Sequence, residues 1–101
     1  MNPLTDYERL VSHIEAALPA VHRFAPPTPV LRLRWLDALI DGTVFLKAEC
    51  LQATGSFKIR GALNVMTPLE QQQSVDRVVA FSSGNHGIGV AYAAKCLKML
   101  A

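Results

Sequence analysis

The sequence is poor in the features that mark several common classes of protein. Its 101 residues include two cysteines, and ten basic against eight acidic side chains leave a net charge of only +2. No apolar run reaches the roughly 18 residues that a membrane-spanning helix requires, and the first residues lack the basic stretch and apolar core of a secretory signal. The cations are also scattered, which argues against a nucleic-acid-binding surface. These absences predict a cytoplasmic protein that contacts neither membrane nor nucleic acid.

The few cysteines also argue against two kinds of site. Cys50 and Cys96 form neither a CxxC pair nor a disulfide framework, so we expect a reducing compartment, two small apolar side chains and no metal site. Half of the residues are hydrophobic and 18% are charged. That balance suits one small folded domain rather than a disordered or fibrous chain.

Apolar spacing and turn residues divide the chain into helices that alternate with strands. Thr5 and Glu8 form a capping box, and apolar residues at helical spacing follow as far as Pro19, where the first helix should end. Prolines make residues 26–29 extended. The remaining predicted elements are a helical turn at 36–39 stopped by Gly42, a strand at 43–48, a helix at 57–67, a short helix from Pro68, a strand at 77–81 and a final helix from about His86.

This order predicts an α/β fold with a parallel sheet, although two strands cannot form such a sheet alone. Residues 88–100 are apolar nearly all round, with Lys95 and Lys98 as the solvated stripe, and no polar tail or capping glycine follows them. Such a helix needs cover. We therefore expect a truncated sequence whose sheet is completed by further chain.

The first segment that suggests chemistry surrounds Lys58. This lysine falls in the first turn of a predicted helix, where the helix dipole is positive. That place, together with partial burial, would lower the pKa of the amine, and a neutral amine can attack a carbonyl to form a Schiff base. The alternative is a solvated surface lysine, which the position alone favours.

The second segment is Ser-Ser-Gly-Asn-His-Gly at residues 82–87. Its hydroxyls, amide, imidazole and free backbone donors lie at a predicted helix start, where a carboxylate or phosphate is readily held. Serine, glycine and asparagine are also ordinary turn and cap residues, so a structural role stays open. Gly84, Gly87 and Gly89 do not form the Gly-x-Gly-x-x-Gly dinucleotide fingerprint.

Taken together, the two segments resemble a known family. Thr-Gly-Ser-Phe-Lys-Ile-Arg-Gly-Ala at 54–62, followed by the 82–87 segment, is similar to the pyridoxal-phosphate enzymes of the tryptophan-synthase β fold, or fold type II, and within them to threonine/serine dehydratases and serine racemases. The resemblance implies a parallel-sheet α/β catalytic domain. Residues 28–101 would be its incomplete N-terminal part, and residues 1–27 an N-terminal helix and extended lead-in.

The resemblance also implies roles for individual side chains. Lys58 would carry pyridoxal 5'-phosphate covalently as a Schiff base and would take the Cα proton of a small amino-acid substrate. Phe57 would lie beside the pyridine ring, and Asn85 would hydrogen-bond the phenolic oxygen of the cofactor. Ser82, Asn85 and His86 would receive the substrate carboxylate.

The reaction that this resemblance favours is dehydration and deamination of threonine, and of serine, to a 2-oxo acid and ammonia by a homo-oligomeric full-length parent. Ser83 leaves an amino-acid racemase open, because it stands where serine racemases have a second catalytic acid/base. Cysteine and threonine synthases are disfavoured, since they usually have Lys-Asp-Arg and Gly-Asn-Thr in place of residues 58–60 and 84–86.

The family holds the cofactor phosphate with a glycine-rich loop further along the chain, and no such loop occurs in these 101 residues. We therefore expect this stretch alone to bind the cofactor poorly and to turn over no substrate. Two other interpretations stay open. One is a catalytically inactive fragment that docks onto a partner, and the other is an α/β module that binds anions.

Overall fold

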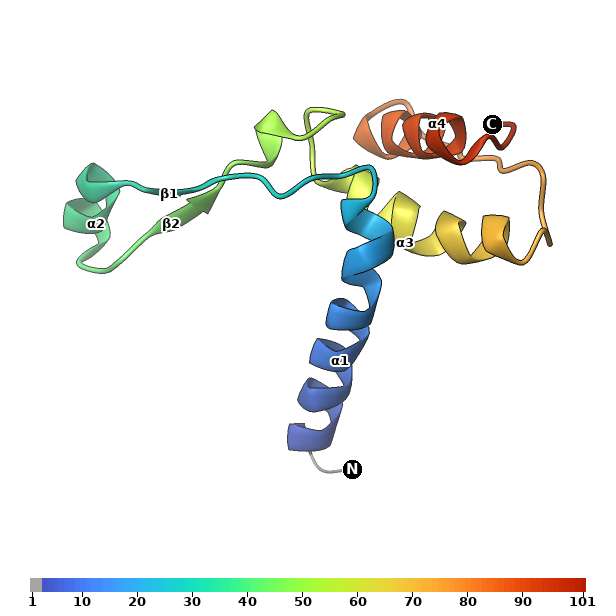
Figure 1. Ribbon diagram of the computed structural model, residues 1–101. Helices are drawn as coiled ribbons and strands as arrows, with labels where there is room; N and C mark the ends of the chain where they lie inside the picture. Colours follow the sequence, from blue (N-terminus) through green and yellow to red (C-terminus); the bar gives the residue numbers. More distant parts are fainter. Residues whose placement is uncertain (1–2) are drawn as a thin grey trace.

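The computed structural model describes residues 3–101 and consists of helices with one small hairpin (Figure 1). The elements in chain order are α1 (Pro3–His22), β1 (Val30–Arg32), α2 (Arg34–Ile40), β2 (Phe45–Lys47), a 3-10 turn η1 (Glu49–Leu51), α3 (Lys58–Gln71) and α4 (Asn85–Leu97). Among these residues no helix is both long and apolar enough to cross a membrane.

The sheet has two strands, β1 and β2, and they run antiparallel with Leu31 opposite Leu46. The helix α2 connects them, so the three elements form an arm that extends away from α3 and α4 (Figure 1). The strand predicted at 43–48 is thus confirmed in its centre, and the helical turn predicted before Gly42 is confirmed as α2.

The strand predicted at residues 77–81 is wrong in its extent. Only Arg77 pairs, in a parallel bridge with Leu100, and the adjacent bonds run from Val78 N to Leu100 O and from Leu100 N to Asp76 O, both 2.9 Å. Val79 is 91% exposed and Phe81 is fully exposed. A strand of a parallel sheet needs neighbours along its whole length, and residues 3–101 supply one bridge.

Two prolines predicted to mark helix boundaries lie inside helices instead. Pro19 lies within α1, which begins at Pro3 and continues to His22, and Pro68 lies within α3, which continues to Gln71. A proline removes one backbone bond from a helix. Buried Val21 holds the turn after Pro19 against the core, and Pro68 directly follows the buried residue Thr67, so tertiary packing outweighs the local preference.

The core lies where α3 and α4 pack together, with the end of α1 against them (Figure 1). Its buried side chains are Val21, Ala25, Ile59, Ala62, Leu63, Met66, Ala93, Ala94, Leu97 and Met99. The helix α4 ends at Leu97 because Lys98 adopts the left-handed conformation, with φ of 57°, and its N–H bonds back to Ala94 and Lys95. A non-glycine residue therefore closes the last helix.

Much apolar surface remains outside this core. Tyr7, Leu10 and Ile14 on α1 are more than half exposed, as is Ile88 on α4. The radius of gyration is 16.6 Å, whereas a compact domain of about 100 residues has about 13 Å. The chain therefore has an extended shape in which one small core positions the ends of α3 and α4.

Candidate functional site

The two motif segments meet where α3 and α4 begin. A Cβ atom added to Gly89, in the second turn of α4, would lie 3.2 Å from Lys58 C and from Ile59 N. The backbone of α4 therefore rests directly on the first turn of α3, a contact that only glycine permits without a shift. Figure 1 shows both helices starting at the same end of the pair. The fold thus brings Lys58 and residues 82–87 to one place.

Residues 82–84 form a bend that leads into α4, and residues 85–87 are the first residues of that helix. A Cβ at Gly87 would lie 2.9 Å from Ser82 O, so this glycine allows the turn to close on itself. The Ser82 hydroxyl accepts a bond of 3.2 Å from Gly84 N. Gly84, the N-cap residue, has no side chain to cap α4, so the first-turn N–H groups of the helix are left for other acceptors. The predicted side chains Ser82, Ser83, Asn85 and His86 are all exposed at this turn.

Lys58 is the first residue of α3, as the sequence predicted, and its side chain is exposed. Its Nζ lies 5.2 Å from the centroid of the Phe57 ring, and its backbone N–H donates a long bond of 3.4 Å to Ser56 Oγ. The partial burial expected of this lysine is not found, because Phe57 is also 59% exposed and shields it from one side only. The amine and the ring are therefore both accessible.

An ionic cluster that the sequence did not reveal lies next to this site. Arg60 binds Glu49 through two bonds, Nε to Oε2 at 2.8 Å and Nη2 to Oε1 at 2.7 Å. The Thr28 hydroxyl donates to the same carboxylate, and Lys47 Nζ lies 3.9 Å from Oε1 while donating to Thr28 O at 2.7 Å. The cluster thus joins the extended lead-in, the end of β2 and the first turn of α3.

The charges of the cluster reinforce one another. Hydrogen bonds from Arg60 hold the pKa of the Glu49 carboxyl at about 2, against an ordinary 4.5; the Thr28 hydroxyl and the charge of Lys47 act in the same direction, and burial opposes them. The same pairing raises the pKa of Arg60. Arg60 belongs to the motif at 54–62, but its partner Glu49 lies 11 positions earlier and Thr28 a further 21, so spacing alone could not reveal the pairing.

Gln52 makes a second tie to the lead-in. Its side chain is buried, its Nε2 donates to Pro26 O at 2.9 Å, and its Oε1 accepts from Ala53 N at 2.9 Å. Both polar atoms of this amide are therefore hydrogen-bonded, and the bond to Pro26 holds the lead-in against the segment before Lys58. Lys47, Glu49 and Gln52 thus have a structural role next to the motif at 54–62.

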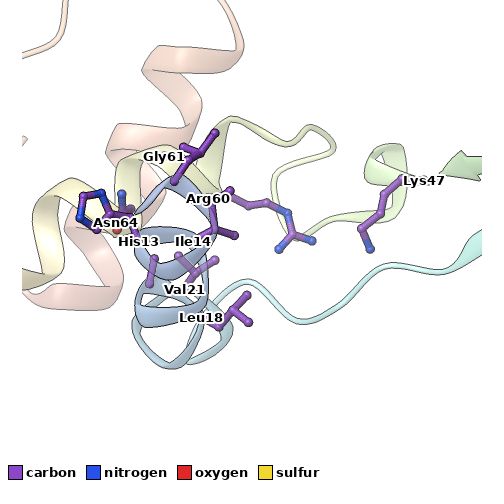
Figure 2. Close-up of a pocket in the computed structure, with 10 residues that line it drawn as sticks. His13, Ile14, Leu18, Val21, Lys47, Arg60, Gly61 and Asn64 are labelled. Carbon is purple, nitrogen blue, oxygen red and sulfur yellow. The ribbon is translucent and has the colours of Figure 1, made fainter. Parts of the chain in front are cut away.

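A hollow of about 530 Å³ lies between α1 and α3 (Figure 2). Its lining residues are Leu10, His13, Ile14, Ala17, Leu18, Val21, Lys47, Arg60, Gly61 and Asn64. None of the predicted site residues lines it, and its two strong cations, Lys47 and Arg60, are already engaged by Glu49. The candidate site is therefore the start of α3 and α4, where the predicted side chains lie, and not this hollow.

Comparison with known proteins defines the family. Residues 21–101 match the family described as "Pyridoxal-phosphate dependent enzyme", so the chain belongs to the pyridoxal-phosphate-dependent enzymes. An L-threo-3-hydroxyaspartate ammonia-lyase of Pseudomonas sp is 53% identical over 76 residues, which are 75% of this chain and 24% of that protein. A catabolic L-threonine dehydratase of Staphylococcus aureus is 42% identical over 85 residues, or 83% of this chain and 25% of that protein.

Solved structures confirm the fold class. The serine racemase of Dictyostelium discoideum superposes with a TM-score of 0.80 and 36% identity over 87% of this chain and 29% of that one. The chain is therefore part of the fold type II architecture, as the sequence predicted. It spans about a quarter of the length of the curated relatives it matches, and the sheet within residues 3–101 is the antiparallel pair β1–β2.

Pyridoxal 5'-phosphate is the cofactor of this family, and the residues at the site fit it. Lys58 offers an amine to its aldehyde, the Phe57 ring lies next to that amine, and the starts of α3 and α4 favour negative charge. There is also room, because a Cβ at Gly55 or Gly84 would meet no atom within 4 Å. In the part of the chain that the structure describes, no group of three or more His, Cys, Asp or Glu could hold a metal ion.

Proposed function

We propose that this protein belongs to an ammonia-lyase that dehydrates and deaminates a β-hydroxy amino acid, threonine or serine, to a 2-oxo acid and ammonia. The observation that carries the proposal is the contact of Gly89 with Lys58, because it joins an accessible amine to a turn rich in hydrogen-bond donors. The names of the Pseudomonas and Staphylococcus relatives support the same class of reaction.

The chain's own residues supply attachment, proton transfer and substrate binding. When bound, pyridoxal phosphate draws electrons away from the substrate Cα. Lys58 would hold the cofactor through its amine, and its Nζ, once free, would be the base that takes the Cα proton. Passing that proton to the departing β-hydroxyl would release it as water, and hydrolysis of the resulting unsaturated amine would give the 2-oxo acid and ammonia. Ser82, Asn85 and His86 receive the substrate carboxylate at the start of α4.

Asn85 and Phe57 complete the cofactor contacts in this proposal. The Asn85 amide, at the first residue of α4, would donate to the phenolic oxygen, and Phe57, whose ring lies next to Lys58 Nζ, would lie beside the pyridine ring. Residues 28–101 then form part of the catalytic domain, and residues 1–27 lead into it. We also propose a cytoplasmic homo-oligomer as the assembled enzyme.

The substrate could also carry a second carboxylate. The Pseudomonas relative is an ammonia-lyase of L-threo-3-hydroxyaspartate, which has the same β-hydroxyl leaving group as threonine and serine. The chemistry assigned to Lys58 is identical for the three substrates. A comparison of 2-oxo acid release by the full-length parent from threonine, serine and L-threo-3-hydroxyaspartate at equal concentrations therefore identifies the preferred substrate.

Racemisation is the second candidate function, and Ser83 favours it. Its exposed hydroxyl lies in the same turn as Asn85, and the Dictyostelium relative in structure is a serine racemase. A racemase needs a second proton carrier on the face opposite Lys58. If the full-length parent forms D-serine from L-serine, and Ser83→Ala loses this activity but keeps 2-oxo acid release, the racemase activity would be assigned to Ser83.

The test of the common core of both proposals is to trap the cofactor on its lysine. The purified full-length parent is mixed with pyridoxal phosphate, reduced with borohydride and mapped by peptide mass. The chain has four lysines, Lys47, Lys58, Lys95 and Lys98, so the others serve as internal references. We predict label concentrated at Lys58 and absent from that peptide in Lys58→Arg. Equal labelling of all four lysines would contradict the proposal and favour an inactive, partner-dependent chain.

A further inference from the structure

The start of α3 has no side-chain cap of its own. The residue before the helix, Phe57, makes no capping hydrogen bond, and the bond from Lys58 N to Ser56 Oγ is long at 3.4 Å. Uncapped first turns fray readily. The direction of the Lys58 side chain must therefore be fixed by contacts that arrive from another part of the chain.

Arg60 supplies such a contact. Its backbone N–H bonds to Phe57 O at 3.0 Å, while its guanidinium takes both oxygens of Glu49. A bidentate arginine–carboxylate pair fixes orientation as well as distance. Arg60 thus links the turn that precedes Lys58 to a carboxylate on the 3-10 turn η1.

The carboxylate itself is firmly held. Glu49 follows β2 by two residues, accepts from the Thr28 hydroxyl and lies near Lys47. Its side chain is 15% exposed and that of Arg60 is 25% exposed, so water competes less for this pair than for a surface ion pair. These contacts therefore fix the start of α3 relative to β2 and to the lead-in.

We propose that Glu49 is a positioning residue that, through Arg60, sets the direction of Lys58. The inference rests on the proposed role of Lys58 as the lysine that attaches the cofactor. Glu49 touches neither cofactor nor substrate in this proposal. Its effect comes from holding the first turn of α3 in one orientation.

The test compares Glu49→Gln with a matched control in the purified full chain. Asp37→Asn is the control, because Asp37 is also 15% exposed and binds both Nε and Nη2 of an arginine, Arg32, at 2.9 and 2.7 Å. That pair lies in the arm formed by β1, α2 and β2, away from α3 (Figure 1). The measured quantity is the rate of borohydride trapping at Lys58, relative to Lys95 and Lys98.

We expect Glu49→Gln to slow trapping at Lys58 by about tenfold to a hundredfold, the range that follows from misplacing a reacting group by about 1 Å. Asp37→Asn should stay within about twofold of the wild type, as expected for an ion pair outside the site. A partly unfolded chain would label all its lysines more evenly. The ratio of trapping at Lys58 to trapping at Lys95 and Lys98 therefore distinguishes a positioning role from a loss of stability. Arg60→Lys keeps the positive charge without the bidentate contact, so it should slow trapping at Lys58 by less than Glu49→Gln does and by more than Asp37→Asn does.

The outcomes separate the two proposals. Selective trapping at Lys58 in the wild type and in Glu49→Gln at equal rates would overturn the positioning role and leave the proposed function intact. Equal labelling of all lysines in the wild type would overturn both. If Glu49→Gln fails to fold by circular dichroism, Arg60→Lys decides, and an unchanged rate in that variant would overturn the positioning role.

Discussion

Replacement of Gly89 by alanine tests whether the contact between α4 and the first turn of α3 builds the site. The new Cβ would lie 3.2 Å from Lys58 C and Ile59 N and 3.3 Å from Lys58 O, whereas carbon atoms in good contact are about 3.5 to 4.0 Å apart. All three neighbours are backbone atoms, which cannot rotate away. The whole helix α4 must therefore move by a few tenths of an ångström.

The magnitude follows from two opposing effects. Overpacking of this kind costs about 1 to 3 kcal/mol, and the better helix propensity of alanine offsets about 1 kcal/mol of that cost. We therefore predict a net loss of about 1 kcal/mol in the free energy of unfolding. For a domain of this size the loss corresponds to a fall of about 5 °C in Tm.

Gly61→Ala is the matched control, because Gly61 lies in α3 with nothing within 4 Å of its added Cβ. There the helix propensity acts alone, so we predict a gain of about 1 kcal/mol. Urea unfolding followed by circular dichroism measures both variants. The reasoning is refuted if Gly89→Ala proves as stabilising as Gly61→Ala, since the two substitutions would then share one environment.

Two further predictions concern groups whose environment is unusual. Because the pKa of Glu49 is about 2 in the folded chain and 4.5 ordinarily, its stabilising contribution is fully present above pH 4.5 and is lost as the pH falls through about 2. Glu49→Gln should therefore flatten that part of the stability–pH curve, and an unchanged curve contradicts the assignment. Thr67 is 2% exposed and its hydroxyl has no hydrogen-bond partner among residues 3–101. Thr67→Val should therefore raise the free energy of unfolding by about 1 kcal/mol in urea titration, whereas a loss would mean that the hydroxyl has a partner.

The sequence predicted the elements whose signals are local. The helix start near Lys58 and the short helix before Gly42 depend on neighbouring residues, and the structure has both. The errors fall where distant contacts decide. Pro19 stays helical because the end of α1 is buried against the core, and residues 77–81 lack strand pairing beyond Arg77.

The candidate site divides in the same way. Lys58 and the segment at residues 82–87 could be recognised from the sequence, because the identity of a residue is enough to show that its side chain is reactive. In the sequence, Gly89 stands out only as a possible part of a dinucleotide fingerprint. Its role in the structure depends on the absence of a Cβ atom where α3 and α4 cross. The pairing of Glu49 with Arg60 was equally hidden, because an acid and a base in one sequence have many possible partners until the fold selects one.

The order of residues in α3 explains how one short motif contains both the reactive group and its support. Ile59, Ala62, Leu63 and Met66 are buried at the spacing of one helical face, and Ile59 is fully buried directly after Lys58. Burial of that neighbour fixes the rotation of the helix about its axis. The pair formed by Arg60, one residue further on, fixes the orientation of its first turn. The backbone at Lys58 is therefore held by both of the residues that follow it, while the Lys58 side chain stays exposed.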